Sequence, residues 1–193
     1  MSNRESRLRR IRTLLGSYLD VDRLLGENPS VRREDVEQVL SDLGTAVPSG
    51  EELRAEAVVI YSDGASSGNP GPSGVGFVLT DESGAVLLEG AEYIGETTNN
   101  VAEYRALRAA LDAAARLGAR RVTIHADSEL LVRQLNGQYK VKSSNIRPLY
   151  ADVRQRLDRL EEWTASHLPR DHNERADALA RQAVEDGRSG AAS

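Results

Sequence analysis

The sequence contains no cysteine among its 193 residues, so disulfide bonds and thiolate metal ligands are excluded. Aromatic residues make up only 4% of the chain, and histidine occurs three times, at His125, His167 and His172. A bound metal ion must therefore be held by oxygen or imidazole ligands. Long apolar runs are also missing, since none approaches the roughly 20 residues that a membrane-spanning helix needs.

The N-terminus lacks the apolar core and cleavage site of a secretory signal, although five arginines lie between Arg4 and Arg12. These absences predict a cytoplasmic protein. Excess positive charge is absent too, because the net charge is −5. That balance weighs against a protein that binds nucleic acid by charge alone. It does not exclude nucleic acid, since metal-binding carboxylates lower the net charge of a chain whose binding face is positive once metal is bound.

What is present divides the chain into three parts. Residues 1–50 carry two apolar patterns at helical spacing, which predict a small helical hairpin followed by a linker. Residues 56–187 alternate strand and helix patterns, which indicates one α/β domain with a mixed sheet. Residues 188–193 are expected to be a disordered tail. Strands are expected at 57–61, 76–80, 85–88, 121–126 and 163–167, and helices at 99–117, 129–135, 146–160 and 174–186.

Four acidic residues stand at positions that are unusual for solvent-exposed charge. Asp63 and Asp127 each end an apolar predicted strand, although either one alone could equally start a turn or cap a helix. Glu103 lies on the apolar face of its predicted helix, where a carboxylate is costly unless it is paired or binds a metal. A structural Glu103 with a buried arginine partner stays open. Asp177 lies at the edge of a core face, and alone it reads as an acid favoured early in a helix.

Together the four acids indicate a site for a hard cation. Oxygen-only ligands suit magnesium or manganese, and magnesium takes a few carboxylates together with substrate phosphate and water. Two such ions can activate a water molecule and stabilise the leaving oxygen of a phosphodiester. The residues by themselves therefore indicate a metal-assisted phosphoryl hydrolase.

Four motifs give the chain a close resemblance to the ribonuclease H type 1 family. In chain order they are Asp63–Ser66 with Gly68–Gly71, Thr97–Glu103, Ala126–Ser128 and Asn173–Ala180. One such string is weak, but the four occur in the family's order and at similar intervals over residues 57–184. The resemblance implies a ribonuclease H-like fold, with a five-stranded mixed sheet flanked by helices, to which the N-terminal helical hairpin is an addition.

The resemblance also implies an activity and a metal centre. It predicts an endonuclease that hydrolyses the RNA strand of RNA–DNA hybrids and leaves 5′-phosphate and 3′-hydroxyl ends. It assigns Asp63, Glu103, Asp127 and Asp177 as catalytic residues and metal ligands. Two divalent ions are implied, Mg²⁺ by preference with Mn²⁺ as an alternative, and Asp63 bridges them. One ion orients the attacking water and the other stabilises the leaving 3′ oxygen.

The same resemblance assigns residues that contact the hybrid. An enzyme that distinguishes RNA from DNA must contact the 2′-hydroxyl, for which the glycine-rich loop, the Asn-Asn pair and Ser128 are expected in the minor groove. Thr98 and Asn145 are expected to bind a phosphate of the DNA strand. The full predicted set is Gly64, Ser66, Gly68, Asn69, Thr98, Asn99, Asn100, Ser128 and Asn145.

A histidine assists product release or proton transfer in some members of the family. Counting back from Asp177 places His167 at that position, with Arg170 and His172 as competing candidates. His167 could equally be a strand-end histidine without a catalytic role.

Two other functions stay open on the sequence alone. One is a DNA-cutting nuclease of the resolvase or transposase type with the same fold, which would not need the Asn99-Asn100 pair or the glycine-rich loop. The other is a nucleic-acid-binding module with an inactive site, against which the complete set of carboxylates argues.

Overall fold

The structure is a computed structural model that describes residues 32–42 and 54–190. The chain divides into two units, Met1–Leu53 and Arg54–Ser193. In the first unit, helix α3 (Arg33–Asp42) covers most of the second predicted helical pattern, and the first pattern lies outside the described residues. The helical hairpin therefore stays a prediction. No helix among the described residues combines the length and the apolar character needed to cross a membrane.

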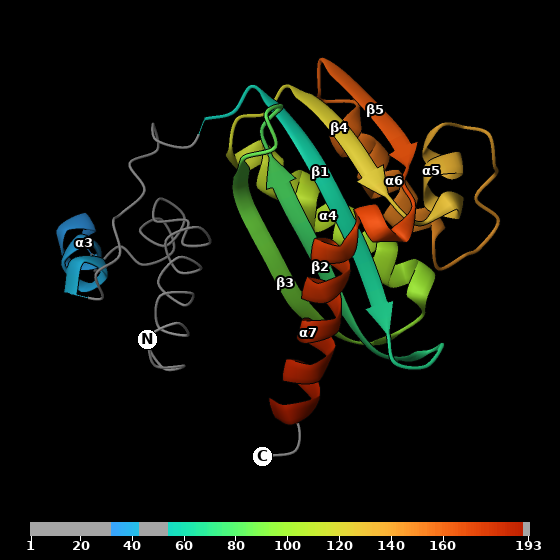
Figure 1. Ribbon diagram of the computed structural model, residues 1–193, viewed down its shortest axis with the longest axis horizontal. Helices are drawn as coiled ribbons and strands as arrows, with labels where there is room; N and C mark the ends of the chain where they lie inside the picture. Colours follow the sequence, from blue (N-terminus) through green and yellow to red (C-terminus); the bar gives the residue numbers. More distant parts are fainter. Residues whose placement is uncertain (1–31, 43–53, 191–193) are drawn as a thin grey trace. The chain divides into compact units, whose positions relative to one another are not determined.

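The second unit is built on the predicted five-stranded mixed sheet, with the strand order β3-β2-β1-β4-β5 (Figure 1). The antiparallel strands are β1 (Ala57–Ser66), β2 (Gly71–Thr80) and β3 (Val86–Thr97). Strands β4 (Arg121–Ala126) and β5 (Glu162–His167) extend the sheet from β1 by parallel pairing. The sheet is therefore antiparallel on one side of β1 and parallel on the other.

Helices cover both faces of this sheet. They are α4 (Asn99–Arg116), α5 (Glu129–Leu135), α6 (Arg147–Leu157), the short 3-10 helix η1 (Arg170–His172) and α7 (Glu174–Gly190). Helix α7 crosses β1, β2 and β3 on the face opposite α4 and α6 (Figure 1). The main core lies between the sheet and α4 with α6, where Ile60, Leu79, Leu107, Ile124 and Leu157 are fully buried. Their burial is the main stabilising contribution to this unit.

Strand β1 is longer than predicted, so Asp63 lies inside the strand and not at its end. Parallel pairing with β4 stops where Ser62 faces Ala126, but antiparallel pairing with β2 continues until Ser66 faces Ser73. The apolar run from which the strand was predicted is shorter than the strand, because the run marks only buried apolar positions. The backbone of Asp63 is therefore held by β2 on one side, while on the other side its pairing with β4 has already ended.

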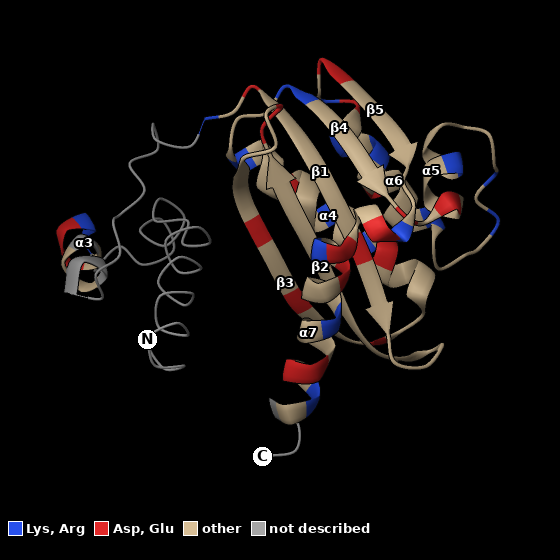
Figure 2. Cartoon of the chain, in the orientation of Figure 1, with Lys and Arg blue, Asp and Glu red and all other residues tan. Residues whose placement is uncertain are grey.

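Strands β2 and β3 also extend beyond their predicted bounds of 76–80 and 85–88. Acidic residues interrupt the apolar pattern along β3, which forms one edge of the sheet (Figure 2). An edge strand with one solvated face needs no continuous apolar run, and charged residues there hinder pairing with other chains.

Helix α7 lies close against β2 because two glycines of that strand leave room for it. A Cβ atom at Gly76 would lie 2.3 Å from the carbonyl oxygen of Ala176 and 2.4 Å from the amide nitrogen of Ala180. Gly74 meets the same helix one turn further on, at the carbonyl oxygen of Ala180. Because Gly76 pairs with Asp63, this close approach brings the first turns of α7 near Asp63.

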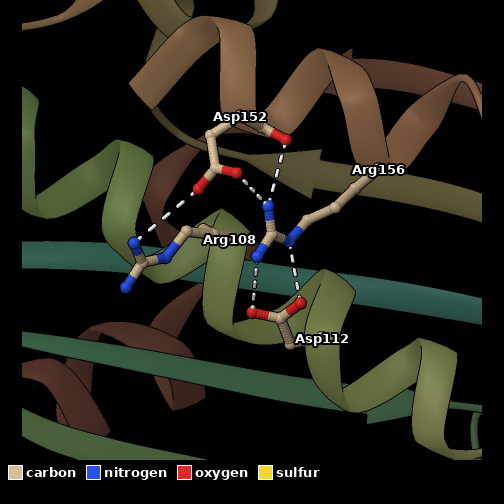
Figure 3. Close-up of polar contacts among 4 residues, drawn as sticks. All are labelled: Arg108, Asp112, Asp152 and Arg156. Carbon is tan, nitrogen blue, oxygen red and sulfur yellow. Dashed lines mark hydrogen bonds and ion pairs between the residues drawn. The ribbon is translucent and has the colours of Figure 1, made fainter. Parts of the chain in front are cut away.

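Helix α4 is joined to α6 by a network of charged residues (Figure 3). The Arg156 guanidinium donates to both carboxylate oxygens of Asp112, at 2.7 and 3.1 Å, and also binds Asp152. Arg108 lies 3.7 Å from the other oxygen of Asp152. Arg108 and Asp112 of α4 therefore form part of a bonded interface with α6. This interface helps to fix the helix that carries Glu103.

The last helix is also longer than predicted. Helix α7 continues to Gly190, so the predicted tail is wrong for residues 188–190, while 191–193 lie outside the described residues. Glycine weakens an isolated helix, which is why the pattern predicted an end at Gly187. In the structure Gly187 packs flat on the Tyr93 ring of β3, where a Cβ atom would lie 2.1 Å from the ring. This tertiary contact supports the final turn.

Candidate active site

Three of the four predicted acids converge in the structure. Asp63, Glu103 and Asp127 bring carboxylate oxygens within 4.8 Å of one another. Because Ser62 pairs with Ala126, the residues that follow them, Asp63 and Asp127, lie side by side beyond the parallel ladder. The cluster therefore forms at the carboxyl ends of parallel strands, the usual place for a site in an α/β sheet.

Glu103 reaches the cluster because Gly64 has no side chain. A Cβ atom at Gly64 would lie 2.3 Å from the amide nitrogen of Glu103 and 2.3 Å from the carbonyl carbon of Ala102. The backbone of α4 thus touches β1 directly, next to Asp63. Gly64 acts here as a packing residue, whatever contact it also makes with substrate.

Two of the three carboxylates are buried, and Asp127 is half-buried beside them. Asp63 is 4% exposed and Glu103 is 5% exposed. Burial, reinforced by the charges of Asp127 and Asp177, raises the pKa of Asp63 to about 7. Burial and the two neighbouring aspartates also raise the pKa of Glu103 well above its ordinary value. In both cases desolvation of the carboxylate is the larger cause, and repulsion from the neighbouring carboxylates adds to it.

The donor atoms of the cluster fit a divalent cation. Within the described residues, Oε2 of Glu103 has no hydrogen-bond partner, while Oε1 accepts a long bond of 3.4 Å from Asn99 Nδ2. A buried carboxylate oxygen without a partner is costly unless a cation neutralises it. All ligands are hard oxygens, which suit Mg²⁺ or Mn²⁺ and not a softer metal. The arginine partner that stayed open for Glu103 is not found in residues 32–42 and 54–190.

Asp177 occupies a different environment from the other three acids. It is buried, but its carboxylate forms ion pairs with Arg170 at 2.6 Å and with Arg181 at 2.7 Å. Its charge still contributes to the raised pKa of Asp63, so it lies beside the cluster. The structure thus brings together three predicted ligands and holds the fourth next to them with two arginines. The role of Asp177 as a metal ligand stays a prediction.

Asn173 is a buried residue of the site, and no role was predicted for it from the sequence. Its Nδ2 atom donates to the Ser62 carbonyl at 3.1 Å and to Asp127 Oδ1 at 3.3 Å, so it orients Asp127 from the α7 side. Its Oδ1 atom is buried without a partner among the described residues. The fourth motif begins at Asn173, but an asparagine just before a helix is also an ordinary N-cap residue.

The carboxylate cluster opens into a cavity of about 590 Å³. Four residues of the predicted hybrid-contacting set line it, namely Gly64, Ser66, Asn99 and Ser128. The opposite wall comes from η1 and α7, through Arg170, Arg181, Val184, Glu185 and Arg188. Apart from Arg170, a competitor of His167, no residue of this α7 wall was predicted. No sequence pattern marks this wall, because Arg181, Glu185 and Arg188 are ordinary exposed polar residues of a helix and Val184 is an ordinary buried one.

Several predicted contact residues are engaged with the protein itself. The Ser66 hydroxyl donates to the Gly68 and Thr97 carbonyls, which ties the glycine-rich loop to the end of β3. Asn69 Oδ1 accepts the backbone N–H of Asn99 at 3.2 Å. Asn69 therefore caps α4, whereas Thr98, at the N-cap position, makes no side-chain cap bond.

The remaining predicted contacts differ in where they lie. Ser128 caps α5 by accepting the Leu131 N–H at 3.4 Å, and Gly68 adopts a φ of 108° that suits glycine in the loop. Asn100 and Asn145 are exposed, in the first turn of α4 and just before α6, and neither lines the cavity. The substrate role of the whole set stays a prediction.

Of the three candidates for the assisting residue, Arg170 alone contacts the carboxylate of a predicted ligand, through its ion pair with Asp177. His167 is exposed at the end of β5, with Nε2 3.2 Å from the Asp127 carbonyl oxygen. His172 is exposed and lies 3.9 Å from Asp171. A catalytic role for His167 therefore stays a prediction, and the geometry favours Arg170.

The fold and the carboxylate cluster define a protein of the ribonuclease H-like class. The sequence matches the family described as Reverse transcriptase-like over residues 61–183. Ribonuclease HI of Halobacterium salinarum is 44% identical over 133 residues, which are 69% of this chain and 67% of that protein. Its crystal structure aligns with a TM-score of 0.66 at 45% identity, covering 67% of this chain and 98% of the other. The chain belongs to the ribonuclease HI family.

Two further relatives extend the comparison. A bifunctional protein of Mycobacterium tuberculosis is 43% identical over 129 residues, which are 66% of this chain but 35% of that protein. LC11-RNase H1, solved in complex with an RNA/DNA hybrid, aligns at 43% identity with a TM-score of 0.65, covering 67% of this chain and 98% of the other. The N-terminal unit lies outside the matched family region.

The raised pKa of Asp63 predicts a pH-dependent loss of stability without metal. Asp63 has a pKa of about 7 in the folded chain and an ordinary value of 3.8, so the folded state binds more protons between these values. Stability therefore falls as pH rises through that window. In chelator we expect Tm, followed by circular dichroism, to fall between about pH 5 and about pH 8. Asp63→Asn should flatten this fall and be the more stable protein at the higher pH.

Added Mg²⁺ should raise the Tm of the wild type at the higher pH and have little effect on Asp63→Asn. The matched control is Asp158→Asn, an acid with a 63% exposed side chain at the end of α6, which should keep the wild-type slope. Parallel slopes for the wild type and Asp63→Asn would contradict the raised pKa of the buried Asp63 carboxylate.

Proposed function

We propose that this chain hydrolyses the RNA strand of RNA–DNA hybrids and leaves 5′-phosphate and 3′-hydroxyl ends. The observation that carries the proposal is the convergence of the buried Asp63 and Glu103 with the half-buried Asp127. The hybrid seen with the related LC11-RNase H1 supports this substrate. Family membership supports the reaction type, endonucleolytic hydrolysis of a phosphodiester.

The carboxylates of Asp63, Glu103 and Asp127 would hold divalent cations, with Asp177 as a fourth ligand. We propose two ions, Mg²⁺ by preference and Mn²⁺ as the alternative. Bound cations of this kind supply Lewis acidity and a water that is nucleophilic near neutral pH. The protein contributes three converging carboxylates, and the Asp177 carboxylate lies beside them in its ion pairs.

The chain's own residues bind and orient around that centre. Asn173 fixes Asp127, and Asn99 bonds Glu103, so the carboxylates are aligned before substrate arrives. Such alignment reduces the reorganisation needed in the transition state. Arg170 opposes the negative charge at the cavity and holds Asp177. The scissile phosphate would enter against this guanidinium.

Recognition of RNA would fall to the residues along the cavity rim. Asn99 and Ser128 line the cavity on either side of the carboxylates, where polar side chains can bond a 2′-hydroxyl. Gly68, Asn69 and Asn100 would follow the same minor groove. Thr98 and Asn145 would bind a phosphate of the DNA strand. DNA lacks the 2′-hydroxyl, so these contacts would select the RNA strand.

A cleavage assay with separately labelled strands tests the function. In Mg²⁺ we expect cleavage of the RNA strand of a hybrid, no cleavage of its DNA strand, and no cleavage of a DNA duplex of the same sequence. A chelator should abolish the reaction. Comparable cleavage of the DNA duplex would favour the resolvase-type nuclease instead, and hybrid binding without any cleavage would indicate a binding module.

A further inference from the structure

The cavity extends well beyond the carboxylates, along the second half of α7. Its wall there consists of Arg181, Val184, Glu185 and Arg188, and Ser67 of the glycine-rich loop also lines it. Basic and acidic positions follow one another down this helix (Figure 2). The twelve residues from Asp177 to Arg188 span about 16 Å of helix. This wall is therefore long enough to meet substrate outside the linkage that is cut.

Arg188 differs from the other arginines of the wall in its partners. Arg170 and Arg181 both form an ion pair with the single carboxylate of Asp177, at 2.6 and 2.7 Å. In the described part of the chain, Arg188 forms no ion pair, and its hydrogen-bond partner is the neutral Ser67 hydroxyl at 3.4 Å. Glu185, one turn earlier on the same wall, is not within ion-pair distance of it. Arg188 is thus a cation facing the cavity with capacity for an anion.

The position of Arg188 depends on the packing of the preceding residue. Gly187 lies flat on the Tyr93 ring of β3, so close that any side chain would overlap the ring. This contact carries α7 past the point where the sequence pattern ends and holds the last turn over the cavity rim. Ser67 approaches from the other side, on the loop that Ser66 and Asn69 secure.

We propose that Arg188 and Ser67 together bind a backbone phosphate of the RNA strand, outside the linkage that is cut. The inference rests on the proposed function, because the strand that reaches the carboxylates must follow the same cavity. Both groups donate hydrogen bonds, and a guanidinium matches the geometry of a phosphate. A contact with the backbone alone would add affinity without sequence preference.

The test compares steady-state cleavage of a hybrid by the full chain and its variants at several salt concentrations. Arg188→Ala should raise KM roughly three- to tenfold with kcat unchanged, and should lower the salt dependence of hybrid binding by about one counterion. Arg188→Lys should restore most of the salt dependence, since it keeps the charge. Glu185→Gln should lower KM, because it removes a negative charge from the same wall.

The matched control is Arg116→Ala, which removes an exposed arginine at the opposite end of α4 from Glu103. It should leave KM and the salt dependence unchanged. Fluorescence anisotropy with labelled hybrid in the Asp63→Asn background gives the binding term separately from cleavage. Equal behaviour of Arg188→Ala and Arg116→Ala would overturn the inference while leaving the nuclease function intact. A wild type that binds hybrid but cleaves nothing would instead overturn the proposed function.

Discussion

Asp63→Asn is expected to lower kcat for hybrid cleavage by more than about 10³-fold, with little change in hybrid affinity. Asp63 brings a carboxylate oxygen within 4.8 Å of oxygens of Glu103 and Asp127, and its charge helps to raise the pKa of Glu103. Asparagine keeps the size and one oxygen but removes the negative charge that a cation requires. Hybrid affinity should survive, because the proposed contacts along the cavity rim are untouched.

Single-turnover cleavage and anisotropy on the same preparations measure the two effects. Asp158→Asn, the exposed acid at the end of α6, is again the control and should cleave at the wild-type rate. Excess Mn²⁺ is not expected to restore the Asp63→Asn rate, since the missing charge belongs to the protein. Wild-type turnover by Asp63→Asn would remove this residue from the mechanism.

Gly64→Ala is expected to have the second large effect, because it disturbs the packing of α4 against β1. Its new methyl group would lie 2.3 Å from backbone atoms of Ala102 and Glu103, which have no freedom to turn aside. Helix α4 must then move away from β1 and take Glu103 with it. We expect a loss of about 3 kcal/mol in the free energy of unfolding. We also expect roughly 10²-fold slower cleavage, because a small displacement of a positioned group is costly.

Urea unfolding and kcat measure the two consequences of Gly64→Ala. The control is Gly84→Ala in the β2–β3 turn, where a Cβ atom meets nothing within 4 Å. Because Gly84 has a φ of 87°, this control should cost only about 1 kcal/mol in backbone strain and leave kcat unchanged. If both variants lost equal stability and kept their activity, the close contact between α4 and β1 would not position Glu103.

The sequence predicted the strands and helices well where buried positions recur at the spacing typical of a strand or a helix. Strand β4 and helix α5 have their predicted bounds, because apolar residues alternate in β4 and a serine caps α5. The bounds were wrong where tertiary contacts extend an element, as for β1 and α7. Neither the pairing of Ser66 with Ser73 nor the packing of Gly187 against Tyr93 can be recognised from the neighbouring sequence.

The acidic residues of the candidate site could be predicted from the sequence, but the residues that bond to them could not. Glu103 on an apolar helix face indicated a buried carboxylate, and the structure places it in the cluster. The ion pairs of Asp177 with Arg170 and Arg181 could not be read from spacing, because exposed arginines are common on helices. Asn173 gave only the signal of a helix cap. Which side chains pair with one another depends on the distances between helices and strands, and the residues around a single position do not reveal those distances.

The central claim is that Asp63, Glu103 and Asp127 converge in order to hold divalent cations. Crystals soaked in Mn²⁺, measured for anomalous scattering at the manganese edge, test it most directly. The account predicts anomalous density between these three carboxylates, lost in Asp63→Asn crystals, with a second peak beside Asp63 and Asp177. Density elsewhere on the chain, or none at the cluster under conditions that support hybrid cleavage, would contradict it.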